Sequence, residues 1–206
     1  MDVLAAARAE RAELADLLDT LTDEQWEAPS LCAGWRVRDV AAHVISYEEH
    51  GTADLARRLW AARLRIGRVN DVALREYRGL DRAELARFVR DHLEPRGATA
   101  RFGGRVGLAD CLIHQQDIRR PLGLSREIPA DRLRCVLDFA VTAPPLRGFW
   151  HARGVRLVAT DLDWQRGRGP LARGPGEALV LTLAGRRGVA ADLTGPGATV
   201  LQHRLG

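Results

Sequence analysis

Lysine is absent from this chain of 206 residues, and all 31 of its basic residues are arginine. Such an arginine-only basic set favours a GC-rich, bacterial genome. The formal net charge is only +4, and no dense basic run interleaved with aromatic side chains is present. Because a nucleic-acid-binding surface shows such a run, the composition argues against a nucleic-acid partner.

Cysteine and long apolar runs are also scarce. Cys32, Cys111 and Cys135 are far apart, odd in number and without a CxxC pair, which argues against a disulfide framework. No apolar run approaches the roughly 18 residues of a membrane helix, and the N-terminal stretch MDVLAAARAERAEL is too charged for a signal peptide. We therefore expect a cytoplasmic protein without a membrane partner.

The first three quarters of the chain have the composition and spacing of helices. Apolar residues recur at three-to-four spacing between turn signals, and capping residues such as Asp81 precede several of these stretches. Helices are therefore predicted over residues 3–19, from 36 onward, 52–65, 81–93, 108–119 and 129–143.

The remainder of the chain changes pattern. Val155, Leu157 and Ala159 alternate with polar residues and predict a strand, and residues 162–164 predict a second one. Residues 166–176 are rich in glycine and proline and predict a loop, with a helix following over 177–184. The expected fold is α+β and mainly α, with domains 1–148 and 149–206.

A candidate metal site lies in the stretch LADCLIHQQDIRRPLG, residues 108–123. Asp110, His114 and Asp117 fall within about 60° of one another on a helix surface. Asp110 and His114, at i and i+4, can chelate from one helix, and His43 on another predicted helix can complete a two-histidine, one-carboxylate set. Asp117 is expected to orient the imidazole or to bind substrate. This spacing also arises by chance, so it does not by itself establish a site.

Other candidates carry less weight. Cys111 is predicted to be a packing residue, and Cys32 a loop thiol with a redox role as the weaker option. The glycines of RFGGRVG do not follow a predicted strand, so they are not a nucleotide fingerprint. The remaining histidines have no partners at ligand spacing, and they are His50, His92, His151 and His203.

Two long motifs in the same order resemble a known family. LTDEQWEAPSLCAGWRVRDVAAHV, followed far downstream by DCLIHQQDIRRPLG, resembles the mycothiol-dependent maleylpyruvate isomerase family of the DinB-like superfamily. The resemblance covers the whole chain. It implies a DinB-like, metal-binding four-helix bundle followed by a small α/β C-terminal domain.

The resemblance also implies site residues and a chemistry. The family's metal ligands fall on His43, Asp110 and His114, although the middle ligand is typically Glu. Arg186, in the stretch LAGR, falls on an arginine implicated in activity and is a candidate carboxylate clamp. The expected cofactor is a divalent metal, zinc above all, and mycothiol is the expected thiol cosubstrate.

The implied function is a transferase or isomerase that acts on a small electrophile in an actinobacterial cytoplasm. The expected partners are this electrophile and the thiol, with a homodimer left open. The alternative is a non-catalytic metal- or ligand-binding module of the DinB-like type, in which Asp110 marks a relaxed active site.

Overall fold

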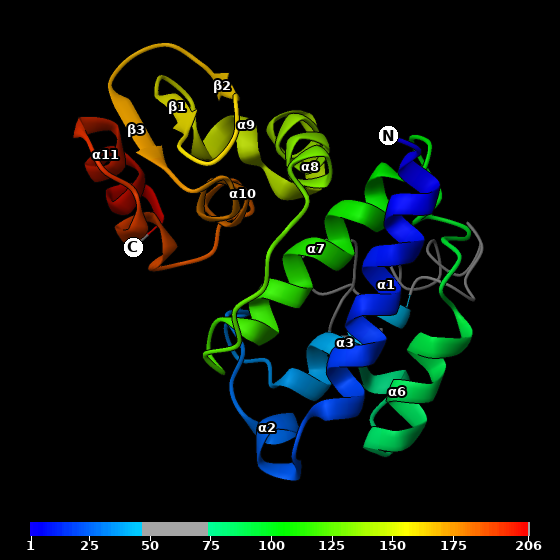
Figure 1. Ribbon diagram of the computed structural model, residues 1–206. Helices are drawn as coiled ribbons and strands as arrows, with labels where there is room; N and C mark the ends of the chain where they lie inside the picture. Colours follow the sequence, from blue (N-terminus) through cyan, green and yellow to red (C-terminus); the bar gives the residue numbers. More distant parts are fainter. Residues whose placement is uncertain (47–73, 206) are drawn as a thin grey trace. The chain divides into compact units, whose positions relative to one another are not determined.

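A computed structural model describes residues 1–46 and 74–205, and the chain divides into two compact units, Asp2–Ser125 and Arg126–Gly206 (Figure 1). The predicted helix over 52–65 and His50 lie outside the described residues. Within the described residues, no helix is long and apolar enough to cross a membrane.

The described part of the N-terminal unit is helical. Two of its helices begin with a reciprocal capping box, Thr22 with Gln25 and Asp81 with Glu84, and Asp81 is a cap that the sequence predicts. Asp2 caps the first helix by accepting hydrogen bonds from two backbone amides. The helices are α1 (Val3–Thr20), α2 (Asp23–Glu27), α3 (Val37–Ile45), α6 (Arg82–Asp91) and α7 (Arg105–Arg119).

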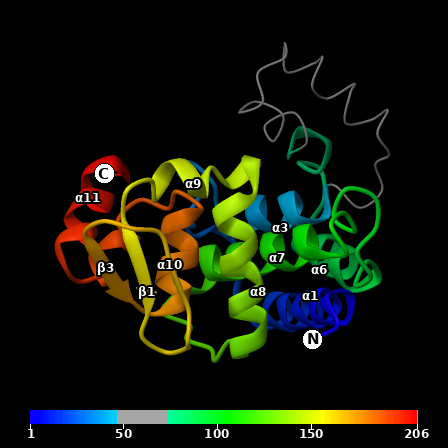
Figure 2. The same ribbon diagram turned by 90° about the horizontal axis from the view of Figure 1, so that it is seen from above.

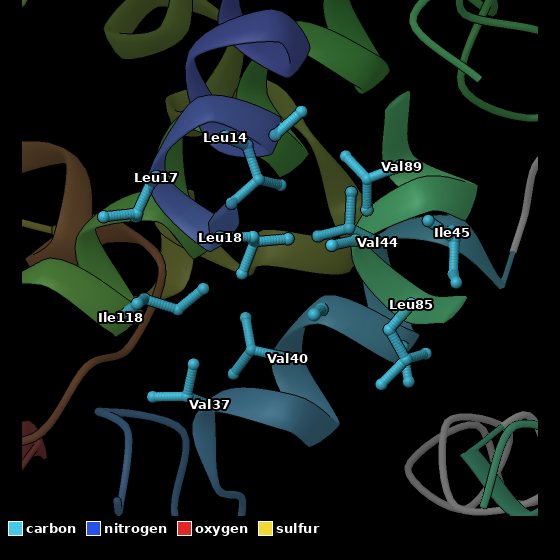
Figure 3. Packing of buried hydrophobic residues seen from close by; sticks show 14 of the residues in the cluster. Leu14, Leu17, Leu18, Val37, Val40, Val44, Ile45, Leu85, Val89 and Ile118 are labelled. Carbon is cyan, nitrogen blue, oxygen red and sulfur yellow. The ribbon is translucent and has the colours of Figure 1, made fainter. Parts of the chain in front are cut away.

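A shared apolar core fixes how these helices pack. The α1 helix packs on α6 and α7, and α3 packs on the same two helices. Their apolar stripes meet in one buried cluster, in which Leu14 and Leu18 of α1 face the valines of α3 (Figure 3). Truncating such a leucine to alanine costs about 2–5 kcal/mol. This core holds α3 beside α7, and those two helices carry the predicted metal ligands.

The C-terminal unit combines helices with a small sheet. The strand order is β2-β1-β3, in which β1 (Arg156–Ala159) pairs parallel to β3 (Leu171–Gly174) and antiparallel to β2 (Gln165–Arg166). Figure 2 shows β1 beside β3. The helical segments are α8 (Ala130–Thr142), η2 (Pro144–Leu146), α9 (Gly148–His151), α10 (Gly176–Leu183), η3 (Val189–Asp192) and α11 (Pro196–Leu205).

The observed composition of elements confirms an α+β, mainly α fold. By its internal contacts the chain divides between Ser125 and Arg126, whereas the sequence predicts a domain boundary at residue 148. The α8 helix accounts for the difference, because its apolar face packs on α10 and α9 of the C-terminal unit.

Two details of the sheet differ from the prediction. Residues 171–174, expected to be loop, form β3, in which Ala172 is fully buried opposite Leu157. The second strand is Gln165–Arg166 and follows the predicted 162–164 stretch, where Trp164 is buried and donates from Nε1 to Asp138 Oδ1 at 2.8 Å. Both details depend on partners distant in sequence, which glycine and proline content does not reveal.

Candidate metal centre

The structure brings together the three candidate ligands of the N-terminal unit. Asp110 and His114 stand one turn apart on α7, and His43 reaches them from the last turn of α3. The Asp110 Oδ1 atom lies 3.7 Å from His43 Nε2 and 3.6 Å from His114 Nε2. The two imidazole rings meet edge to face, with their centroids 4.7 Å apart. Two nitrogens and one oxygen therefore converge on one point.

These three atoms fit a divalent metal ion. All of them lie within 4.8 Å of one another. Bonds of about 2.0–2.1 Å to a tetrahedral zinc ion would place two ligand atoms about 3.4 Å apart, which is close to the separations observed here. Two imidazole nitrogens and a carboxylate oxygen are also the donors that zinc favours at catalytic sites, where a further position stays open.

The burial of the cluster is uneven. The side chains of His43 and His114 are 7% and 9% exposed, whereas that of Asp110 is 24% exposed. Two buried imidazoles thus form the inner wall, and the carboxylate lies on the side that small molecules can reach. This asymmetry is what a site with an open coordination position requires.

The electrostatics of the cluster favour a positive charge. Burial on its own would lower the pKa of His114, but the charge of Asp110, together with hydrogen bonds to Asp117 and Cys32, raises it to about 10. Burial would raise the pKa of Asp110, yet the charges of the two histidines and a hydrogen bond from His43 lower it overall. The carboxylate therefore stays ionised and stabilises a cation between the imidazoles.

Asp117 holds the other side of the His114 ring. Its carboxylate is fully buried, and its Oδ2 atom lies 2.8 Å from His114 Nδ1. A carboxylate only accepts hydrogen bonds, so the proton of this bond resides on Nδ1. With Nδ1 occupied in this way, the Nε2 atom is directed toward Asp110 and His43.

The loop before α3 contributes two residues that spacing did not predict at this site. Cys32 Sγ donates to Asp117 Oδ2 at 3.1 Å and lies 3.9 Å from His114 Nδ1. The ring of Trp35 lies over both histidines, with centroids 5.0 Å from His43 and 6.5 Å from His114. Gly34 has φ +80°, a conformation that favours glycine, and it turns the chain between these two residues.

Cys32, His114 and Asp117 also form a second group with metal-ligand atoms within 4.8 Å. It uses the opposite nitrogen of the His114 ring, Nδ1, which already engages Asp117. The sequence offered one signal for this arrangement, because Cys32 and Trp35 both lie in the C-x-G-W part of the upstream motif.

The other candidates make contacts of their own. Arg186 follows α10 in the C-terminal unit, where its guanidinium donates to Ala184 O at 3.1 Å. Cys111 is buried in the core, as predicted, and donates to the backbone oxygen of Glu10. Ring nitrogens of His92 and His151 engage backbone oxygens outside the cluster.

A pocket of about 660 Å³ lies behind Trp35 in the same unit. Its walls come from the loop at 33–36, from α3 and from residues 74–78. Arg36 and Arg38 line it and pair with Glu27. Arg75 and Arg78 line it too, and have no carboxylate partner among the residues that the structure describes. Among the described residues that line the pocket, arginines outnumber carboxylates, which are represented by Asp39.

The fold and this cluster define a mainly helical α+β protein with a candidate metal centre in its N-terminal unit. Residues 7–102 match the family model described as the mycothiol maleylpyruvate isomerase N-terminal domain, which confirms the family resemblance predicted from the motifs. The matched stretch includes His43 and ends before Asp110 and His114. No curated protein sequence matches the chain significantly.

Two solved structures share the fold. The crystal structure of the mycothiol-dependent maleylpyruvate isomerase is 16% identical, with a TM-score of 0.62 over 95% of this chain and 92% of that chain. The structure of a histidine-to-alanine mutant of a mycothiol-dependent maleylpyruvate isomerase is 15% identical, with a TM-score of 0.58 over the same shares. At this identity the likeness establishes the architecture of the chain, and the activity has to be argued from the site.

Proposed function

We propose that this protein is a metal-dependent enzyme that uses mycothiol as a cosubstrate and acts on a small electrophile as a transferase or isomerase. The observation that carries the proposal is the convergence of His43, Asp110 and His114 in a chain whose N-terminal part matches this family. The proposal places the protein in an actinobacterial cytoplasm.

In this proposal, His43 and His114 bind the metal through Nε2, and Asp110 binds it through one carboxylate oxygen. Zinc is the metal that this donor set favours. When bound, the metal lowers the pKa of a thiol that coordinates it, so that a thiolate is available at neutral pH. Asp117 keeps the Nδ1 proton on His114 and so leaves Nε2 as the donor atom.

Asp110 stands where the family typically has glutamate. The packing of the helices shows how the shorter aspartate side chain can still act as a metal ligand. Its Oδ1 atom already lies between the two imidazoles, within 3.7 Å of both Nε2 atoms. The packing of α3 on α7 therefore places this shorter carboxylate near both imidazoles. This geometry favours a retained metal site over a relaxed one.

A carboxylate-bearing electrophile is the substrate class that the charges favour. Arg75 and Arg78 offer positive charge in a pocket whose wall, Trp35, also contacts the cluster. Arg186 of the C-terminal unit is a second candidate to clamp a carboxylate, because guanidinium binds this group through two parallel hydrogen bonds. The thiolate adds to a conjugated carbon–carbon double bond of the substrate. Rotation about the resulting single bond followed by elimination of the thiolate gives cis–trans isomerisation, whereas protonation and retention of the adduct gives thiol transfer.

The test combines metal analysis with turnover. Protein purified without added metal should hold about one metal ion per chain, and His43→Ala should lose it, whereas the exposed-site control Arg87→Ala should retain it. Mycothiol should then support turnover on a panel of unsaturated carboxylates and other electrophiles. Metal binding without thiol-dependent turnover would support the alternative of a non-catalytic binding module. Absence of metal from the unsubstituted protein would overturn the metal site itself.

A further inference from the structure

We propose that Cys32 is a positioning residue for His114, which it orients through the carboxylate of Asp117. The inference rests on the proposed function in one respect, because it takes His114 Nε2 as a metal ligand. Neither the spacing of the motifs nor the family match assigns a role to this thiol.

The contacts form a chain of three side chains. Cys32 Sγ donates to Asp117 Oδ2 at 3.1 Å, and His114 Nδ1 donates to the same oxygen at 2.8 Å. Asp117 is fully buried, so bulk water does not reach its carboxylate while Cys32 and His114 are in place. One carboxylate oxygen thus receives two donors, and both of them help to fix its rotamer.

The backbone around Cys32 is built to hold the thiol in this place. Leu31 N donates to the backbone oxygen of Asp117 at 3.0 Å, which ties the loop to α7 at the residue that the thiol contacts. Cys32 N donates to Ser30 Oγ at 3.1 Å, and Cys32 O accepts from Trp35 N at 2.9 Å. The loop is closed by a bond from Ser30 N to Trp35 O at 2.9 Å.

The same loop constrains the His114 ring from a second direction. The Trp35 ring lies nearly parallel to it, with an interplanar angle of 24° and centroids 6.5 Å apart. The imidazole is therefore held at Nδ1 by Asp117, and Trp35 forms part of its surroundings. Cys32 connects the two constraints, because it bonds to Asp117 through its side chain and to Trp35 through its backbone.

The consequence for the metal follows from this geometry. Loss of the thiol leaves Asp117 with one donor fewer, which loosens the His114 ring and misdirects Nε2. Changes in residues that orient metal ligands typically lower metal affinity by about 10–100-fold. We expect Cys32→Ala to weaken zinc binding by about 10-fold, at the low end of this range, because the direct bond from Asp117 to His114 survives. Cys32→Ser keeps a donor and should restore most of the loss.

The experiment is a double-mutant cycle on the full chain with zinc as the probe. Zinc affinity is measured by chelator competition for the unsubstituted protein, Cys32→Ala, Asp117→Asn and the double variant. Cys135→Ala, which removes a half-buried thiol of the C-terminal unit, is the matched control. If Cys32 acts through Asp117, its removal has no further effect once Asp117 is asparagine. Equal losses in both backgrounds would overturn the proposal.

Two further readouts separate this proposal from its rivals. In metal-free protein, the NMR signal of the His114 Nδ1 proton should shift and exchange faster in Cys32→Ala and stay unchanged in Cys135→Ala. An unaltered signal would overturn the positioning role, whether or not zinc binds. With cobalt in place of zinc, a thiolate-to-metal charge-transfer band in the absence of added thiol would show Cys32 to be a ligand and would also overturn it. Failure of the unsubstituted protein to bind zinc would count against the proposed function. The NMR signal of the His114 Nδ1 proton would still test the role of Cys32 in that case.

Discussion

Replacing Asp110 with asparagine removes the negative charge between the two imidazoles and keeps the size of the side chain. The carboxylate oxygen lies 3.6 Å from His114 Nε2. At an effective dielectric constant of about 20, two unit charges at this distance interact with about 5 kcal/mol, which corresponds to a change of about three in a pKa. We expect the pKa of His114 in metal-free protein to fall well below about 10 in the variant, because the largest cause that raises it is the charge of Asp110.

This change also alters how stability depends on pH. The pKa of His114 is raised in the folded protein, so its contribution to the free energy of unfolding is complete below about pH 6.5 and is lost as the pH rises through about 10. Asp110→Asn should reduce the decline in stability as the pH rises toward about 10. Urea unfolding of metal-free protein at several pH values within this interval measures the difference.

The primary assay is an NMR titration of the His114 ring in chelator-treated protein. Asp91→Asn, at an exposed residue of α6, is the control and should leave the titration unchanged. The variant should also bind zinc at least about 100-fold more weakly, since a charged ligand is replaced by a neutral one. A pKa that stays near 10 in Asp110→Asn would refute the assignment of the raised pKa to this carboxylate.

Other substitutions and conditions should change zinc content, the pH dependence of zinc affinity, the stability of the apolar core and substrate binding in the arginine-lined pocket. His43→Ala should reduce bound zinc below about a tenth of an equivalent by elemental analysis, because one of only three ligands is lost. Zinc affinity should rise about tenfold per pH unit between pH 6 and 8, measured by chelator competition, since His114 must release a proton to bind. Leu14→Ala should cost about 2–5 kcal/mol in urea unfolding at unchanged m-value. Arg75→Gln and Arg78→Gln should raise KM for a carboxylate substrate and leave KM for an uncharged one unchanged.

The part of the site on one helix could be predicted from the sequence alone. Asp110, His114 and Asp117 follow from the i, i+3 and i+4 geometry of a helix, which local sequence determines. His43 was predicted as their partner with the help of the family motif, because spacing does not say which helix faces α7. The structure shows the shared apolar core that places α3 there.

The contribution of the loop could not be predicted. Cys32 and Trp35 reach His114 because Leu31 bonds to the backbone of Asp117, and this tertiary contact leaves no periodic trace in the sequence. The sequence predicts Cys32 to be a loop thiol, and nothing in the sequence around it indicates that it contacts Asp117. The upstream motif contains both residues but assigns neither of them a role.

The C-terminal part shows a similar limit. The amphipathic pattern of α8 predicted a helix, but an apolar stripe does not identify the helix on which it packs, and α8 packs on α10. Likewise, β3 forms where glycine and proline predicted a loop, because its parallel partner β1 supplies the hydrogen bonds.

The most direct test of the account is X-ray absorption spectroscopy of the zinc-loaded protein before and after addition of mycothiol. We predict nitrogen and oxygen ligands alone before the addition, with a scattering contribution from imidazole. A single sulfur ligand at about 2.3 Å should appear afterwards. A sulfur ligand present from the start, or a spectrum that mycothiol leaves unchanged, would contradict the claim that His43, Asp110 and His114 hold a metal ion that binds the thiol.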